Sequence, residues 1–102
     1  MSIGATQPFR PSGTVTLSAS TTSANITLPG AGEAVLVYNA AAATAFFRFG
    51  TDGTVAASTA DTPLPPGGRM LVHAGNYAKT AAAVLAAGTG AVYFTRGDGT
   101  VY

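Results

Sequence analysis

The chain has 102 residues, of which 9% are charged and none is cysteine, and its formal net charge is +1. This length supports one domain that can bury a core without disulfide or metal cross-links. The lack of cysteine excludes disulfides and thiolate metal sites. The near-zero charge argues against an electrostatic nucleic-acid binder, and the scarcity of charge leaves self-repulsion weak. The composition therefore favours a protein that associates with other protein chains.

The first residues are predicted to form an extended arm over residues 1–11, followed by a β-domain over residues 12–102. Pro8 and Pro11 block a helix in this segment. The segment also lacks the basic region and the apolar run of a targeting peptide. Aromatic and arginine side chains dominate the energetics of interfaces, so Pro8, Phe9 and Arg10 are the predicted interaction residues of the arm.

The rest of the chain has the pattern of short β-strands. Several runs alternate polar with apolar residues or are rich in β-branched and aromatic residues, and turn signals such as Pro29-Gly30 and Asp52-Gly53 separate them. We expect an all-β fold, a single antiparallel β-sandwich of seven or eight short strands that resembles a jelly roll. The strand-like runs are residues 14–19, 24–28, 33–39, 45–50, 69–74 and 91–96, and residues 55–60 are weakly extended.

The alanine-rich stretch at residues 78–87 is ambiguous. Alanine propensity favours a helix that Gly88 would cap. The stretch also precedes Gly88-Thr89-Gly90 and a clear strand at residues 91–96, which favours two strands joined as a hairpin. Strand and helix both stay open at this stage, and the hairpin agrees better with the neighbouring segments.

Strand alternation sorts the large apolar residues into two sets. Val37, Phe47, Val72 and Phe94 belong to the set expected to face the core, together with Val15, Leu17, Ile26, Leu28, Val35, Phe49, Met70 and Val92. A second set falls on the opposite faces, which are either ordinary exposed surface, or covered by the arm or a long loop, or buried by partner subunits. This candidate outer-face patch consists of Leu36, Tyr38, Phe46, Leu71 and Tyr93.

No constellation for chemistry is recognisable. His73 is the single histidine, and the four carboxylates lie alone in separate segments without the spacing of metal ligands. The chain has no nucleophile elbow and no phosphate-binding loop. We therefore predict no enzyme, no catalytic residue, no metal and no cofactor. No apolar run approaches the roughly 20 residues of a membrane span, so no membrane partner is expected.

Four segments carry a resemblance to a known group of proteins. They are residues 35–39 (Val-Leu-Val-Tyr-Asn), 46–50 (Phe-Phe-Arg-Phe-Gly), 62–67 (Thr-Pro-Leu-Pro-Pro-Gly) and 88–99, which begins Gly-Thr-Gly. In this order they resemble small virion proteins of tailed bacteriophages and prophages, over residues 33–99. The resemblance implies a head-decoration, or cement, protein that binds the major capsid protein or other virion proteins. It implies a homo-oligomer on the capsid surface, assembled in the cytoplasm of the bacterial host, and supplies no catalytic residues.

Two other functions stay open. One is a different virion component, such as a head–tail connector or a tail-fibre protein. The other is a carbohydrate-binding β-sandwich module, in which Tyr38, Tyr77 and Tyr93 would form an aromatic platform. Against the sugar-binding module, the chain has no tryptophan and few charged residues beside its aromatics.

Overall fold

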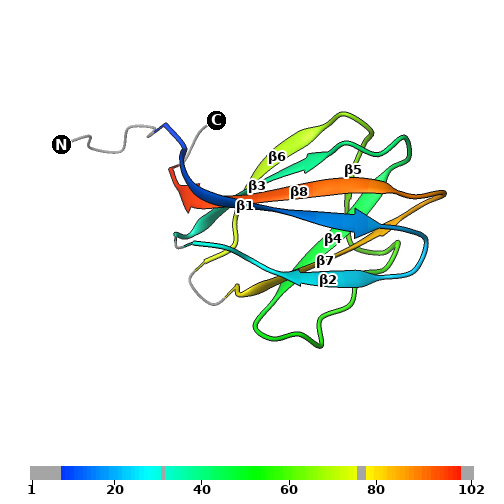
Figure 1. The fold of residues 1–102 in the computed structure, drawn as a ribbon, viewed down its shortest axis with the longest axis horizontal. Coiled ribbons are helices and arrows are strands. Elements are labelled where there is room, and N and C mark those ends of the chain that lie inside the picture. The colour runs from blue at the N-terminus through cyan, green and yellow to red at the C-terminus, as the bar shows by residue number, and fades with distance from the viewer. Residues whose placement is uncertain (1–7, 31, 76–77, 100–102) are drawn as a thin grey trace.

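The computed structural model describes residues 8–30, 32–75 and 78–99. These residues form eight β-strands and no helix, arranged as two antiparallel sheets packed face to face (Figure 1). The predicted all-β sandwich is therefore confirmed. In the described part of the chain there is accordingly no helix that could span a membrane.

Each sheet has four strands, and the strand order is that of a jelly roll. One sheet has the order β1 (Arg10–Ala19), β8 (Gly90–Asp98), β3 (Ala34–Asn39), β6 (Arg69–His73). The other has the order β2 (Ala24–Thr27), β7 (Thr80–Leu85), β4 (Ala45–Gly50), β5 (Thr62–Leu64). Strands that follow one another along the chain mostly lie in different sheets, so the loops cross between the two layers.

The core lies between the sheets, as the alternation predicts for most positions. Val37, Phe47 and Phe94 are at most 3% exposed. Phe49 packs edge-on against the rings of Phe47 and Phe94, with centroid distances of 5.7 and 6.2 Å. Three of the four residues with the strongest core prediction are thus confirmed.

The edge strand β6 departs from that prediction. Val72 is only half-buried against the core, and Met70 is 37% exposed although its side of the strand faces inward. Both lie on a strand with a neighbour on one side alone, β3, so solvent reaches them from the open side. Alternation identifies the face of a residue but not its distance from a sheet edge.

The alanine-rich stretch is strand β7, not a helix. All six of its residues are buried, because β7 is a central strand with β2 and β4 on its two sides and is covered on both faces. Small side chains allow both layers to approach the strand closely. The predicted hairpin with the following strand is wrong: β7 and β8 belong to different sheets, and the turn with Gly88 at φ 70° carries the chain from one sheet to the other.

The first sheet begins inside the segment predicted to be an arm. Arg10 pairs with Asp98 and Pro11 with Gly97, followed by a bulge before Gly13. Residues 10 and 11 are therefore part of the sandwich. Of the remainder of the predicted arm, Pro8 and Phe9 are described, and residues 1–7 lie outside the described residues.

One end of the sandwich is closed by a buried arginine. The Arg96 side chain is 6% exposed and donates hydrogen bonds to the carbonyl oxygens of Gly32 at 2.9 Å, Gly75 at 3.2 Å and Ala78. It thereby ties the β2–β3 and β6–β7 connections to β8. The buried charge is satisfied by carbonyl dipoles, which is the condition for an arginine to be stable inside a protein.

Candidate interaction surface

The outer face of the β1-β8-β3-β6 sheet carries two rows of side chains in register. The first row crosses the four strands as Thr16, Tyr93, Tyr38 and Arg69. The second row crosses them as Thr14, Thr95, Leu36 and Leu71. These eight residues are called the outer sheet face below. It contains a single charged side chain, that of Arg69.

A stacked tyrosine pair lies at the centre of the outer sheet face. The rings of Tyr38 and Tyr93 are 6.0 Å apart between centroids with an interplanar angle of 27°, and Tyr38 is 40% exposed. Beside them, the hydroxyls of Thr14 and Thr95 lie 2.8 Å apart and are hydrogen-bonded. A ring held by a neighbouring ring loses little rotamer freedom when a partner covers it, which makes such a pair a suitable binding anchor.

Four of the five residues of the predicted patch meet on this face, and Phe46 does not. Phe46 lies on the outer side of the other sheet, where it packs with Val55, Ala57, Ala82 and Val84. Residues 51–61, the connection between β4 and β5, cover it there. Phe46 is therefore an intramolecular contact and is separate from the outer sheet face.

The covering connection is pinned by hydrogen bonds from β2 and the turn before it. The Asn25 side-chain amide donates to the carbonyls of Gly53 at 2.7 Å and Val55 at 3.2 Å, and the Ser23 hydroxyl accepts from the Ala57 amide at 2.8 Å. A loop held in this way protects the apolar face beneath it from solvent.

The arm residues that the structure describes pack at the end of β8. Pro8 and Arg10 are exposed and Phe9 is half-buried. A Cβ on Gly99 would lie 2.6 Å from the Phe9 Cα and 2.7 Å from the Pro8 oxygen, so only glycine permits this approach. The role of these residues as anchors on a partner stays a prediction.

The acidic groups serve local structure. Asp61 forms an ion pair with Arg48 at 2.9 Å and accepts from the Ser58 amide at 2.8 Å, which fastens the β4–β5 connection. The hydroxyl and then the amide of Thr54 hydrogen-bond Asp52 and hold the pKa of Asp52 below its ordinary value.

His73 and Asp98, at the ends of β6 and β8, also make local contacts. His73 is exposed at the end of β6, with Nε2 3.0 Å from the Gly99 carbonyl oxygen, and Asp98 accepts a hydrogen bond from the Glu33 amide at 3.2 Å. Across residues 8–30, 32–75 and 78–99, no three His, Cys, Asp or Glu side chains come together as metal ligands would.

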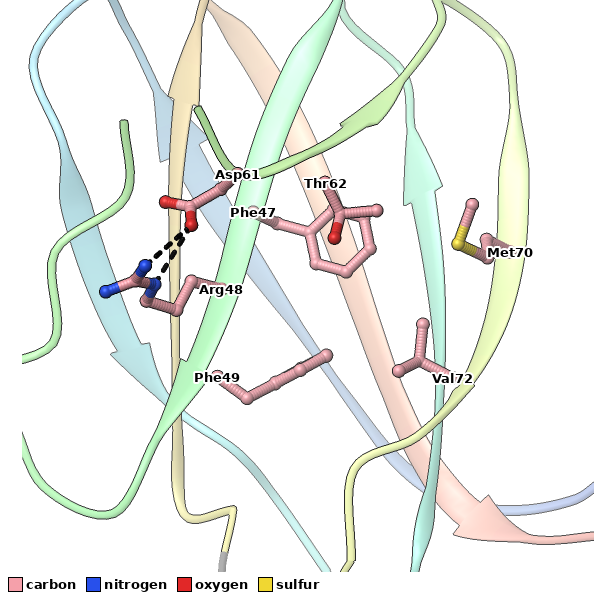
Figure 2. A pocket seen from close by; sticks show the side chains of 7 residues that line it. All are labelled: Phe47, Arg48, Phe49, Asp61, Thr62, Met70 and Val72. Carbon is pink, nitrogen blue, oxygen red and sulfur yellow. Dashed lines mark hydrogen bonds and ion pairs between the residues drawn. The ribbon is translucent and has the colours of Figure 1, made fainter. Parts of the chain in front are cut away.

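A groove opens between the two sheets on the side where β5 and β6 form the edges. It has a volume of about 390 Å³, and its apolar wall consists of Phe47 and Phe49 from β4 and Met70 and Val72 from β6, with Thr62 at the rim (Figure 2). The Arg48–Asp61 ion pair lies on the opposite side of β4 from these side chains. The groove exists because β5 has three residues and leaves half of β4 without a neighbour on this side.

Sequence reasoning missed this groove and the polar half of the outer sheet face. The alternation of residues 14–16, Thr-Val-Thr, was a usable signal, since it places two threonines on the side of the sheet away from Val15.

Comparisons of the chain with models of protein families, with curated proteins and with solved structures find no match.

Proposed function

We propose that this chain is a non-enzymatic structural protein of a tailed-phage virion, a decoration or cement protein that binds and stabilises the head through its outer sheet face. The observation that carries the proposal is the stacked Tyr38–Tyr93 pair, left 40% exposed at Tyr38 on a face with one charged side chain. The resemblance of residues 33–99 to small virion proteins supports the choice of a tailed-phage particle.

The physical properties of the face support docking to another protein. Tyrosine and arginine are enriched at the energetic centre of interfaces, and here Tyr38 pairs in register with Arg69. With few charges to desolvate, the face meets a partner at a low electrostatic cost. Weak contacts repeated over a lattice add through multivalency, so a small face suffices on a capsid.

The fold is compatible with this role and does not by itself establish it. Jelly rolls occur in viral proteins, lectins and other classes, so the function has to come from the surface. The proposed partners are the major capsid protein or neighbouring virion proteins, with copies of the chain forming a homo-oligomer on the particle. Its proposed location is the capsid surface, after assembly in the host cytoplasm.

The test is the copy number of the chain in purified particles, measured by quantitative mass spectrometry. A decoration protein is expected in fixed proportion to the major capsid protein. A copy number that matches a single ring at the portal or the tail would replace this proposal with a connector or tail component. Absence of the chain from particles would reject every virion role.

A second candidate, a carbohydrate-binding module, is favoured by the exposed ring of Tyr38, which lies in one row with Thr16 and Arg69. Sugars stack on such rings and hydrogen-bond to polar neighbours. A glycan array on the purified chain addresses it, with Tyr38→Ala as the control variant. Binding that Tyr38→Ala abolishes would establish this function instead.

A further inference from the structure

The four edge strands of the sandwich differ in how well they resist pairing with another chain. Exposed sheet edges recruit further strands, and bulges, prolines and short strands prevent this. Three edges carry such a device: β1 has a bulge between Pro11 and Gly13, β2 has four residues, and β5 has three residues with Pro63 in the middle. Strand β6 has five residues in unbroken register with β3, contains no proline, and has its single Arg69 at one end. Among the edges that the structure describes, that of β6 is therefore the best suited to pairing.

The main chain of β6 is open on the side away from β3. The Asn39 amide donates to the Gly68 carbonyl in continuation of the β3–β6 register, so the even-numbered residues of β6 direct their main-chain groups toward β3. Main-chain groups alternate between the two sides of an antiparallel strand, so the odd-numbered residues direct theirs the other way. Within the described chain no strand lies on that side, to which the amides and carbonyls of Leu71 and His73 point.

The side chains in the middle of β6 are apolar on both faces of the sheet. Met70 and Val72 point into the groove between the sheets (Figure 2), and Met70 is 37% exposed there. Leu71 lies on the outer sheet face and is half-buried. A strand that pairs with this edge must therefore present apolar side chains on both of its faces, and β6 of a second copy has this pattern.

Two copies of β6 are self-complementary in an antiparallel pair with a two-fold axis at Leu71. This register places Leu71 opposite its own copy and Met70 opposite Val72 of the second copy. The open main-chain groups of the odd-numbered residues then face each other, as a hydrogen-bonded ladder requires. The two Arg69 side chains lie at opposite ends of the pair, and the near-neutral chain has little charge to oppose its self-association.

We propose that two copies of this chain pair through β6 as a two-fold dimer, in which their β1-β8-β3-β6 sheets join into one continuous sheet. The pairing covers the exposed side of Met70 and joins the outer sheet faces of the two copies through Leu71. It thus fixes an interface and a symmetry for self-association. The dimer does not depend on the virion role, since it forms between purified chains.

The first test is sedimentation equilibrium of the purified chain over a dilution series. One strand edge buries an area at the low end for protein interfaces, below about 1,200 Å², so we expect a dimer that dissociates on dilution. The average mass should rise with concentration from the 10.1 kDa of one chain toward twice that value. Leu71→Lys places like charges opposite each other on the axis and should leave the chain monomeric. Thr16→Lys adds the same charge at an exposed position of the same face on β1 and should dimerise as the parent chain does.

Two results of this experiment would overturn the proposal. One is a chain that stays at the mass of a single copy at every concentration. The other is a dimer that Leu71→Lys leaves intact and Tyr38→Ala dissociates, because the copies would then meet through the outer sheet face. Circular dichroism shows whether each variant keeps the fold, and the cross-linking experiment that follows does not require Leu71→Lys to fold.

The second test is disulfide cross-linking, which the absence of cysteine from the chain makes specific. In the proposed register, residue 70 of one copy lies about 4.5 Å from residue 72 of the other between Cα atoms, whereas the two residues 70 lie about 8 Å apart. Disulfides bridge Cα distances up to about 7 Å. A mixture of Met70→Cys and Val72→Cys should therefore oxidise mainly to the mixed dimer, which mass spectrometry distinguishes from the two like dimers. Ser18→Cys, exposed on β1, is the control and should stay mostly monomeric. Mixed and like dimers in random proportion, or equal cross-linking of Ser18→Cys, would overturn the proposal.

Discussion

The outer faces of the two sheets carry similar apolar residues, but a loop covers one face and no described loop covers the other. On the β2-β7-β4-β5 sheet, Phe46 and Val84 lie under the β4–β5 connection, which contributes Val55 and Ala57. On the β1-β8-β3-β6 sheet, no described loop covers Tyr38, which is 40% exposed. A long loop thus covers one face and no described loop covers the other, which is why our proposal places the docking surface on the bare face.

Both faces depend on the shared core, and a substitution in this core is expected to cause the largest loss of stability. Phe94 is fully buried between the sheets and contacts Phe49 edge-on. Phe94→Ala should reduce the free energy of unfolding by about 3–5 kcal/mol, because it removes a buried ring and leaves a cavity. Urea unfolding followed by circular dichroism measures this change. A loss below about 1 kcal/mol would show that the two sheets do not share this core.

The covered face should respond to substitution as part of the core. Phe46→Ala removes the side chain that fills the space under the β4–β5 connection, and since Phe46 is half-buried we expect a loss of about 2 kcal/mol, roughly half the value for a core ring. The same unfolding experiment measures it, and amide exchange should increase in residues 53–57. If stability is unchanged, the loop does not act as a cover.

The bare face should respond in binding and hardly in stability. Tyr38→Ala removes an exposed ring that stacks on the Tyr93 ring, so the loss of stability should stay within about 1 kcal/mol. If the outer sheet face is the docking surface, the same variant should fail to co-sediment with particles that lack the protein. Thr62→Ala, an exposed position at the groove, is the matched control and should bind normally.

The comparison of the two faces also shows which features could be predicted from the sequence. Strand-like patterns identified six of the eight strands and placed Val37, Phe47 and Phe94 in the core, because period two separates the faces of a half-buried strand; β5 was missed, β7 stayed open between strand and helix, and residues 55–60 are loop. Alternation could not separate Phe46 from Leu36, since each occupies an outward position and the difference is that residues 51–61 fold back over Phe46. The weakly extended pattern of residues 55–60 gave no sign that this segment folds over a sheet.

The alanine-rich strand β7 could also not be recognised from its local sequence pattern. Residues 80–85 lack alternation because β7 is buried on both faces, and composition alone then favours a helix. The groove was equally hidden, since it results from the shortness of β5 relative to β4. The lengths of neighbouring strands and the paths of loops depend on tertiary packing, which a local sequence pattern does not predict.

The smallest expected effect concerns the pH dependence of the cover. Hydrogen bonds from Thr54 hold the pKa of Asp52 below its ordinary value of 3.8, so the charged form favours the folded turn. The stabilisation of the turn by the charged Asp52 side chain is complete at pH values above the ordinary pKa, and it is lost as the pH falls through the lower pKa of the folded state. Acid should therefore increase amide exchange at Thr54 and the neighbouring loop before it affects the amides of β3 and β8 beneath the bare face. Asp52→Asn, which cannot ionise, should remove this step from the pH profile of the loop while the profiles of β3 and β8 stay as they were; an unchanged loop profile would show that another group controls the cover in acid.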